Sequence, residues 1–452
     1  MPLPLRPSLI LALCLLPGAA FACALPPSVI LLLPTGYYMA GAAVTVAVTA
    51  LLGVLAGRLP AMRPHLLGER QVLVPLTVSS YLSFIAFLGL VLIGLFGQRD
   101  PMHNLMTLVF WTGVWVALPL ASMLFGNLWR ALNPWTAPVR IARTLLGRTG
   151  GAGLSRLGHW PAVAGYAGFA WFQIVSLRPD DPAVLAGVAL AYWLAIFVLA
   201  VAEGEEWLEQ GEFLSLFFAC ISRIAPFWAT EDGRRLRVFA GWPGTQIVAM
   251  PALSASGVAF VTLALASLTF DGLAETFWWM GLIGENPLEF TGRSAVMGVN
   301  TLGLIAVWVL TAGGILGAIW LGRRMGGRFA AGPLMLSFLA IAAGYHAAHY
   351  LVTLLTVGQY TLAALNDPFM QGQSLLGLPM LYVSFGFLAD ATVMQAIYAA
   401  QFAAILGAHL LAVVLALKLA GHARAIAHLP LTVLMVGYTV LGLWLLSTAR
   451  GA

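Results

Sequence analysis

The segment AAGYHAAHYLVTLL, from Ala342 to Leu355, lies in the middle of a long apolar stretch with the composition of a membrane-spanning helix. It carries two histidines three residues apart, His346 and His349. Imidazole side chains are unfavourable in lipid, and in membrane helices they face a bundle interior or a functional site. The segment therefore predicts a helix that spans the membrane and turns one polar face toward its neighbours.

The composition of the whole chain agrees with this interpretation. Its 452 residues are 61% hydrophobic and 9% charged, with a mean hydropathy of +0.92. A soluble domain carries about 25% charged residues, so the composition indicates an integral membrane protein. The net charge of +5 does not indicate nucleic-acid binding, because the basic residues are sorted by membrane side.

The pattern predicts an all-α, polytopic membrane helix bundle that forms one domain, residues 23–452. About 20 apolar residues cross a bilayer, and ten stretches are long enough. We expect spans at 37–57, 72–97, 105–125, 159–177, 183–202, 247–270, 294–321, 329–357, 392–418 and 429–447.

The N-terminus reads as a signal peptide, residues 1–22. Arg6 precedes an apolar run, and Ala20-Phe21-Ala22 offers a small-residue cleavage site. Cleavage would leave Cys23 as the first residue of the mature chain. Lipidation of Cys23 has weak support, because a lipoprotein signal has Leu three residues before the cysteine and this chain has Ala20. The alternative is an uncleaved first helix.

The basic residues fix the predicted orientation. One set of loops holds 17 of the 22 Lys and Arg residues, and cytoplasmic loops collect such residues. The mature N-terminus is then periplasmic, and the chain lies in a bacterial inner membrane. The cytoplasmic set comprises Arg58, Arg63, Arg70, Arg130, Arg140, Arg143, Arg148, Arg156, Arg223, Arg234, Arg235, Arg237, Arg323, Arg324, Arg328, Lys418 and Arg424.

Three connecting segments are too long and too aromatic to be simple links. We expect 203–228 to form an amphipathic helix on the cytoplasmic surface, with Trp207, Leu208 and Leu214 as apolar contacts. Residues 271–293 and 358–390 are expected to fold back onto the bundle at the periplasmic interface.

His346 and His349 are about 60° apart around a helix, so both imidazoles can address one volume. At about 1.5 Å per residue they lie roughly 16 and 12 Å below the outer end of their span. Three amides on neighbouring spans fall at depths of roughly 5 to 14 Å. These are Asn300, Gln395 and Gln401.

This layer favours a divalent metal site, zinc or calcium, with His346, His349 and Gln401 as ligands. The alternative is that the histidines only form hydrogen bonds between helices, and H-x-x-H alone lacks the Glu of a zincin helix. Haem is a further alternative, although two histidines on one helix face cannot bind it from opposite sides. His409, roughly 25 Å deep, belongs to another layer.

Carboxylates lie above the layer on the outer side, Asp390 among them. Asp271 and Glu275, at i and i+4 where a span ends, face one direction. They can act as general base toward a metal-bound water or as further ligands.

The strings GNLWRALNPW, FDGLAETFWWMGLIGENPLEFTGRSAVMGVNTLGL, GYHAAHYLV and GQYTLAALNDPF resemble bacterial multi-pass membrane proteins named fenitrothion hydrolase. The resemblance covers roughly Thr107 to Ala420. It implies a membrane-bound hydrolase that cleaves the P–O–aryl bond of organophosphorus triesters, and it allows for a second protein subunit. No catalytic motif is carried over from it.

The expected partners are membrane lipid and a hydrophobic small-molecule substrate. Two other functions stay open at this point. One is a haem or metal protein in electron transfer or oxidase assembly. The other is a transporter whose path would use Asn300, Gln401 and His409.

Overall fold

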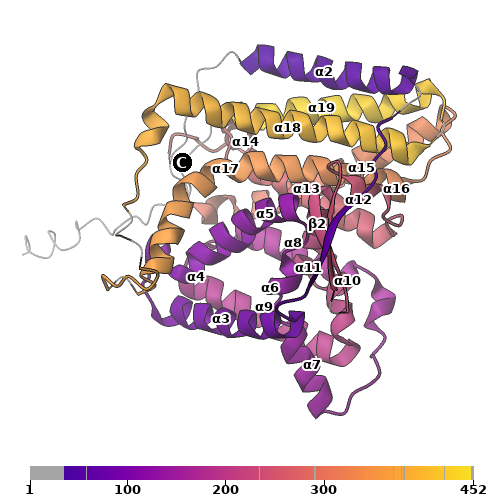
Figure 1. The fold of residues 1–452 in the computed structure, drawn as a ribbon. Helices are drawn as coiled ribbons and strands as arrows, with labels where there is room; N and C mark the ends of the chain where they lie inside the picture. The colour runs from indigo at the N-terminus through magenta and orange to yellow at the C-terminus, as the bar shows by residue number, and fades with distance from the viewer. Residues whose placement is uncertain are drawn as a thin grey trace, which may run out of the picture.

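The computed structural model describes residues 35–56, 59–233, 235–289, 292–369, 371–377, 379, 382–421 and 423–448, and forms the predicted helical bundle (Figure 1). The predicted signal peptide and Cys23 lie outside these residues. Within them, nine helical segments are long and apolar enough to span a membrane. They are α2 (Thr35–Ala56), α3 (Leu76–Phe96), the continuous run of α4 (Leu105–Leu108), η2 (Val109–Ala117) and α5 (Leu118–Phe125), α9 (Pro182–Glu203), α13 (Ala255–Ala274), α15 (Arg293–Arg324), α16 (Ala331–Met335) with α17 (Phe338–Asn366), α18 (Ala391–Ala420), and η7 (Ala425–His428) with α19 (Leu429–Ser447).

The one remaining predicted span, 159–177, forms a shorter helix of 15 residues, α8 (Trp160–Ile174). The backbone N–H of His159 donates to Ser256 at the start of α13, and the amide of Gln173 donates to Asp271 near the end of α13. Contacts at both ends mean that α8 runs parallel to α13 over nearly the full length of that span.

Loops predicted to share one side of the membrane contact one another. On the predicted outer side, Arg99 pairs with Asp181 at 3.2 Å. On the predicted inner side, Arg140 pairs with Glu205 at 2.6 Å, and this pairing raises the pKa of Arg140. The loops therefore gather at two opposite ends of the bundle, as a multi-pass membrane protein requires.

The segment 203–228 differs from the surface helix expected there. It begins with η4 (Glu205–Trp207) and α10 (Leu208–Gly211), and then α11 (Phe213–Ile221) lies inside the bundle with eight of its nine residues buried. Glu212 is buried as its N-cap, accepting from the N–H groups of Leu214 and Ser215 and from the Tyr192 hydroxyl. Because α11 is apolar on all sides, no face of it suits water, and it packs inside the protein.

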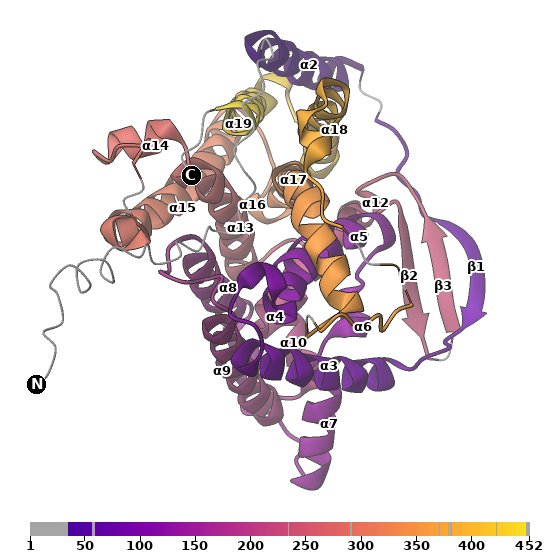
Figure 2. The same ribbon diagram turned by 90° about the vertical axis from the view of Figure 1, so that its left-hand side faces the viewer.

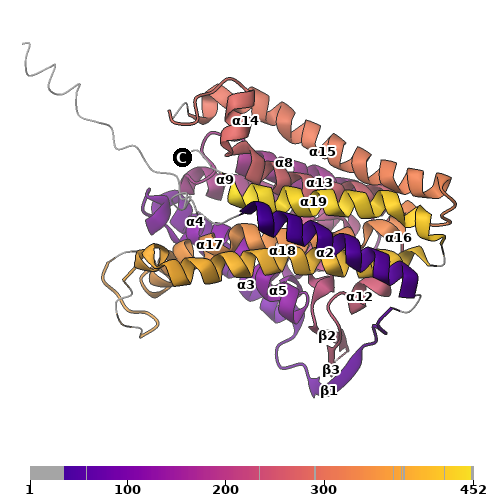
Figure 3. The same cartoon turned by 90° about the horizontal axis from the view of Figure 1, so that it is seen from above.

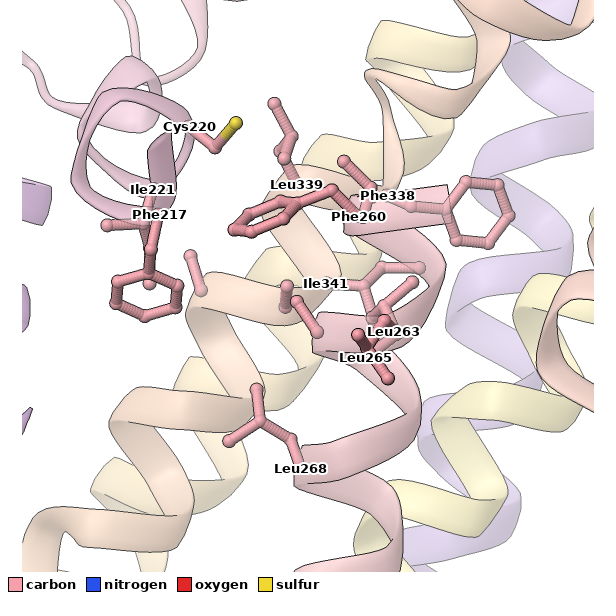
Figure 4. Packing of buried hydrophobic residues seen from close by; sticks show 14 of the residues in the cluster. Phe217, Cys220, Ile221, Phe260, Leu263, Leu265, Leu268, Phe338, Leu339 and Ile341 are labelled. Atoms are coloured by element: carbon pink, nitrogen blue, oxygen red, sulfur yellow. The ribbon is translucent and has the colours of Figure 1, made fainter. Parts of the chain in front are cut away.

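Figure 4 shows this packing at close range. Phe217 and Ile221 of α11, Phe260 and Leu268 of α13, and Leu339 of α17 belong to one buried apolar cluster. α13 is the most deeply buried of the nine spans, with 67% of its apolar window inside the protein. The helix α13 is therefore surrounded by protein on most sides. The polar residues described below lie near its C-terminal end.

A three-stranded antiparallel sheet, which the sequence did not suggest, lies at the edge of the bundle on the predicted inner side (Figure 2). Its strands are β1 (His65–Gln71), β2 (Phe227–Asp232) and β3 (Arg235–Ala240), in the order β1-β3-β2. Glu69 of β1 pairs with Arg237 of β3 at 2.9 Å.

The two predicted outer segments also take more definite forms. In 271–293, α14 (Phe277–Leu282) follows α13 and is capped by the Thr276 hydroxyl. In 358–390, α17 continues nine residues beyond its predicted end at Val357, and the short helix η6 (Gly386–Ala389) precedes α18. The remaining short helices are η1 (Pro101–His103), α6 (Trp129–Leu132), α7 (Thr136–Leu145), η3 (Leu154–Leu157), η5 (Ser222–Ile224) and α12 (Thr245–Val248).

α2, α18 and α17 lie side by side along one flank of the bundle (Figures 1 and 3). α17 and α18 approach closely at Gly344, where a Cβ would overlap the side chain of Ala408 and lie 2.6 Å from the carbonyl oxygen of Ala404. Gly344 is needed here because its missing side chain lets the two backbones meet.

We therefore expect Gly344→Ala to force α17 and α18 apart. Overpacking of this kind costs about 1–3 kcal/mol, so the thermal midpoint in detergent should fall. Gly407→Ala on α18 is the matched control, because a Cβ there meets nothing within 4 Å. Equal midpoints for the two variants would contradict the close contact.

Candidate functional site

The candidate site is centred on Asp271, near the predicted outer end of α13. One of its carboxylate oxygens, Oδ2, lies 3.0 Å from His349 Nε2, 2.8 Å from the Tyr350 hydroxyl and 3.4 Å from Gln173 Nε2. The donors come from α17 and α8. A buried carboxylate needs such donors, because an isolated charge in a low-dielectric interior is strongly unfavourable.

Tyr350 joins this carboxylate to a fourth element. Its hydroxyl donates to Asp271 and accepts from Gln173 Nε2 at 2.8 Å and from Trp115 Nε1 at 3.1 Å. A hydroxyl has one donor and two acceptor positions, so the capacity of this one is fully used. Tyr350 thus ties α8, α13, α17 and η2 together at one point.

His346 bonds to the backbone of η2. Its Nε2 lies 3.0 Å from the carbonyl oxygen of Trp115. In an α-helix that carbonyl would accept from the N–H of residue 119, but residue 119 is Pro and has no N–H. The segment Val109–Ala117 is a π-helix, a form that concentrates at functional sites.

These partners determine the tautomers of both histidines. A carboxylate and a carbonyl can only accept, so Nε2 is the donor in His346 and in His349. In the neutral rings Nδ1 then carries a lone pair. Both Nδ1 atoms are buried and have no hydrogen-bond partner among the described residues. Each ring can therefore accept a proton or bind a metal ion through Nδ1.

The arrangement matches a common pattern around metal ions. A metal-binding histidine usually donates its other N–H to a carboxylate or a backbone carbonyl. His349 donates to Asp271 and His346 donates to the Trp115 carbonyl. In the part of the chain that the structure describes, however, no three His, Cys, Asp or Glu residues gather as a metal-binding group. Further ligands would have to be other groups or water.

Arg293 holds one wall of the site in place. Its guanidinium donates to the carbonyl oxygens of Gln173, Ile174 and Ser176 at 3.1–3.3 Å, which caps the end of α8. The adjacent loop contains Asp180, whose pKa is raised by burial, while Arg293 acts in the opposite direction. The position of Gln173 thus depends on a cation at the start of α15.

Exposure decreases from the carboxylate inward. The side chain of Asp271 is 16% exposed and that of His349 is 8% exposed, whereas His346 is fully buried. A small molecule can therefore reach the pair of Asp271 and His349 before it reaches His346.

The other predicted site residues lie elsewhere. Gln401 donates to the backbone of Ala348, and Asn300 accepts from Trp279 Nε1. Asp390 caps α18, and Gln395 is exposed. Glu275 follows α13 as its half-buried C-cap residue. Of the predicted set, Asp271 and His349 are in direct contact with each other.

His409, which the sequence analysis assigned to another layer, bonds to the backbone of its own helix, α18. Its Nδ1 lies 2.8 Å from the carbonyl oxygen of Ile405, and its ring lines a cavity of about 10 Å³ shared with Tyr345 and Tyr438. Such a volume holds about one water molecule.

Sequence reasoning missed three residues of the site, Trp115, Gln173 and Tyr350. Tyr350 directly follows His349, but it was not selected as a site residue. Gln173 is a lone amide inside an apolar stretch, and it could have been selected on the same ground as Asn300. Trp115 could not be selected by type, but Pro119 inside an apolar span marks a carbonyl that needs another donor.

No protein-family model matches this chain, and neither the curated proteins nor the solved structures include a significant match. The chemistry of the site is therefore argued from its own residues.

Tyr350→Phe should weaken the fold, because it leaves the indole N–H of Trp115 without its acceptor and removes one of the donors to Asp271. A buried unsatisfied donor costs about 1–3 kcal/mol. Thermal unfolding in detergent measures the effect. Tyr360→Phe on the same helix is the control, since the Tyr360 hydroxyl has no hydrogen-bond partner in the described residues. An unchanged midpoint for Tyr350→Phe would contradict the network.

Proposed function

We propose that this chain is a membrane hydrolase in which Asp271 and His349 activate a water molecule for attack on a neutral organophosphorus triester. The observation that carries the proposal is the hydrogen bond from His349 Nε2 to Asp271, which leaves a buried, unpartnered Nδ1. A histidine held by a carboxylate, with its other nitrogen free, is the usual arrangement of a general base.

In this mechanism Asp271 fixes the tautomer and stabilises the imidazolium that forms. His349 Nδ1 removes a proton from water as the water oxygen forms a bond to phosphorus. The P–O bond to the aryl group breaks and the aryl oxide leaves with the electron pair. The proton taken up by His349 passes to the aryl oxide, which gives the phenol and returns the imidazole to its neutral form. The products are a phosphodiester and a phenol, so one water molecule is consumed for each triester.

A divalent metal ion, zinc or calcium, is the proposed cofactor. The Nδ1 atoms of His346 and His349 are the donors that would hold it. Since His349 Nδ1 has one lone pair, it cannot hold the ion and act as the base at the same time; with the ion bound, the Asp271 carboxylate would take the proton from water instead. When bound, such an ion polarises the phosphoryl oxygen or sulfur and lowers the pKa of a bound water. Asp271 and the Trp115 carbonyl would then orient the two imidazoles, which raises ligand basicity.

The substrate class follows from the position of the site and from the resemblance noted above. A neutral aryl ester partitions into the outer leaflet of the bacterial inner membrane and meets the Asp271 end of the bundle from there. Trp278 on α14 is 55% exposed and contributes aromatic surface at this end. The next residue, Trp279, is buried against Phe270 and Asn300.

The alternative functions have less support. Haem ligation through Nε2 would require His346 or His349 to give up a hydrogen bond that places it. A transport path through Asn300, Gln401 and His409 would use side chains that already bond to groups beside them.

The proposal is tested with purified protein in nanodiscs and a neutral triester that has a chromophoric nitrophenyl leaving group. His349→Gln and Asp271→Asn should each lower the turnover number by about 10²–10⁴-fold, the usual contribution of a general base. Gln395→Ala, an exposed amide on α18, should leave it unchanged. Wild-type turnover in the His349 variant would refute the assignment.

The metal is tested separately by elemental analysis of protein purified without chelators. We expect about one divalent ion per chain in the wild type, and its loss in His346→Gln and in His349→Gln, because each removes one of the two imidazole donors. His409→Gln is the control and should retain it. A metal-free wild type that still hydrolyses the triester would remove the metal from the mechanism and leave the general base in place.

A further inference from the structure

A second feature lies on the opposite side of α17 from the site. An apolar groove with a volume of about 530 Å³ runs between α2, α5, α17 and α18, within the range of about 300–1,000 Å³ typical of small-molecule sites. Among the described residues that line it, Thr49 is the one that carries a polar side chain, and the others are apolar or aromatic. Ala347 lines the groove and is about 160° around the helix from His349, so the groove faces away from the candidate site.

Small side chains make the groove deep. Ala343 and Ala347 of α17 and Ala404 and Gly407 of α18 form part of its floor, where the two helices approach closely. α2 forms another wall, beside α18 (Figure 3). A narrow apolar channel along the helices suits a hydrocarbon chain.

One end of the groove has the chemistry of a membrane interface. Trp242 lines it and is 64% exposed, and tryptophan favours the headgroup level. Met62 and Ile224 line it as well, and the residues that follow and precede them, Arg63 and Arg223, are both exposed. This end belongs to the loops that the basic residues assign to the cytoplasmic side.

These two arginines have no carboxylate partner among the residues that the structure describes. Arg63 and Arg223 form no ion pair with any residue in the described ranges, unlike Arg140 and Arg237 at the same end of the bundle. A guanidinium binds a phosphate group with paired hydrogen bonds. Basic pockets between membrane helices on the cytoplasmic side bind anionic lipid headgroups.

We propose that the groove binds an acyl chain of an anionic phospholipid, with its phosphate held by Arg63 and Arg223. The acyl chain lies against the small residues of α17 and α18, and Trp242 marks the depth of the headgroup. This assignment is independent of the hydrolase proposal, because the two features share no residue.

The test uses the full chain in mild detergent with equal amounts of phosphatidylglycerol and phosphatidylethanolamine that carry identical acyl chains. Native mass spectrometry then measures which lipid stays bound. The wild type should retain phosphatidylglycerol in preference. In the double variant Arg63→Gln with Arg223→Gln that preference should fall by roughly fivefold for each arginine removed.

A matched control separates local from general charge. Arg70→Gln with Arg156→Gln removes the same charge from exposed positions on the same side that do not line the groove. It should keep the wild-type preference. If the control loses the preference as far as the Arg63 and Arg223 variant does, the headgroup site is overturned.

A third variant tests the groove itself. Gly407→Leu places a side chain into the open groove without meeting protein atoms at its Cβ, so the protein should still fold. It should retain several-fold less of both lipids. Undiminished lipid in this variant, equal retention of the two lipids by the wild type, or a dimer in place of the lipid adduct would each overturn the proposal.

Discussion

A carboxylate inside a membrane helix bundle has to be surrounded by hydrogen-bond donors, and that requirement organises the end of the bundle where Asp271 lies. Asp271 meets it with donors from α8 and α17, and Tyr350 extends the bonding to η2. In lipid no water is available to replace a missing donor, so the four elements must keep their relative depth. The register of the helices and the geometry of the candidate site therefore have the same physical origin.

The same reasoning explains why a π-helix lies opposite the two histidines. Pro119 removes the donor that the Trp115 carbonyl would have in an α-helix, and His346 supplies one from α17. The Trp115 carbonyl gains a donor, and the buried Nε2–H of His346 gains an acceptor. Both are polar features at membrane depth, and such features are retained where they serve a packing or chemical purpose.

The sequence was sufficient to predict the bundle because long apolar runs at membrane length leave few alternatives to a helix. It was not sufficient for α11, because a helix of nine residues is too short to span a membrane and was therefore assigned to the surface. The strands β1 and β3 were missed because they are short, polar and partly exposed, and they pair across more than 150 positions of the chain. Of the site, Asp271 and His349 were found from residue type and predicted depth. Tyr350 and Gln173, which bond to Asp271, and Trp115, which bonds to Tyr350, were not found, because only the packing of separate helices brings these side chains together.

α17 shows how one helix can carry two different surfaces without being amphipathic in the usual sense. One side presents His346, His349 and Tyr350 to the bundle interior, and another presents Ala343, Gly344 and Ala347 to α18 and the groove. The first side is polar, whereas the second is apolar and made of small residues. Tight packing at Gly344 fixes α17 against α18. Rotation of α17 about its axis, which would move His349 and Tyr350 away from Asp271, is therefore opposed by this packing. Close packing of the small residues thus holds the imidazoles in position, and a change on the groove side of α17 reaches the site only by moving the whole helix.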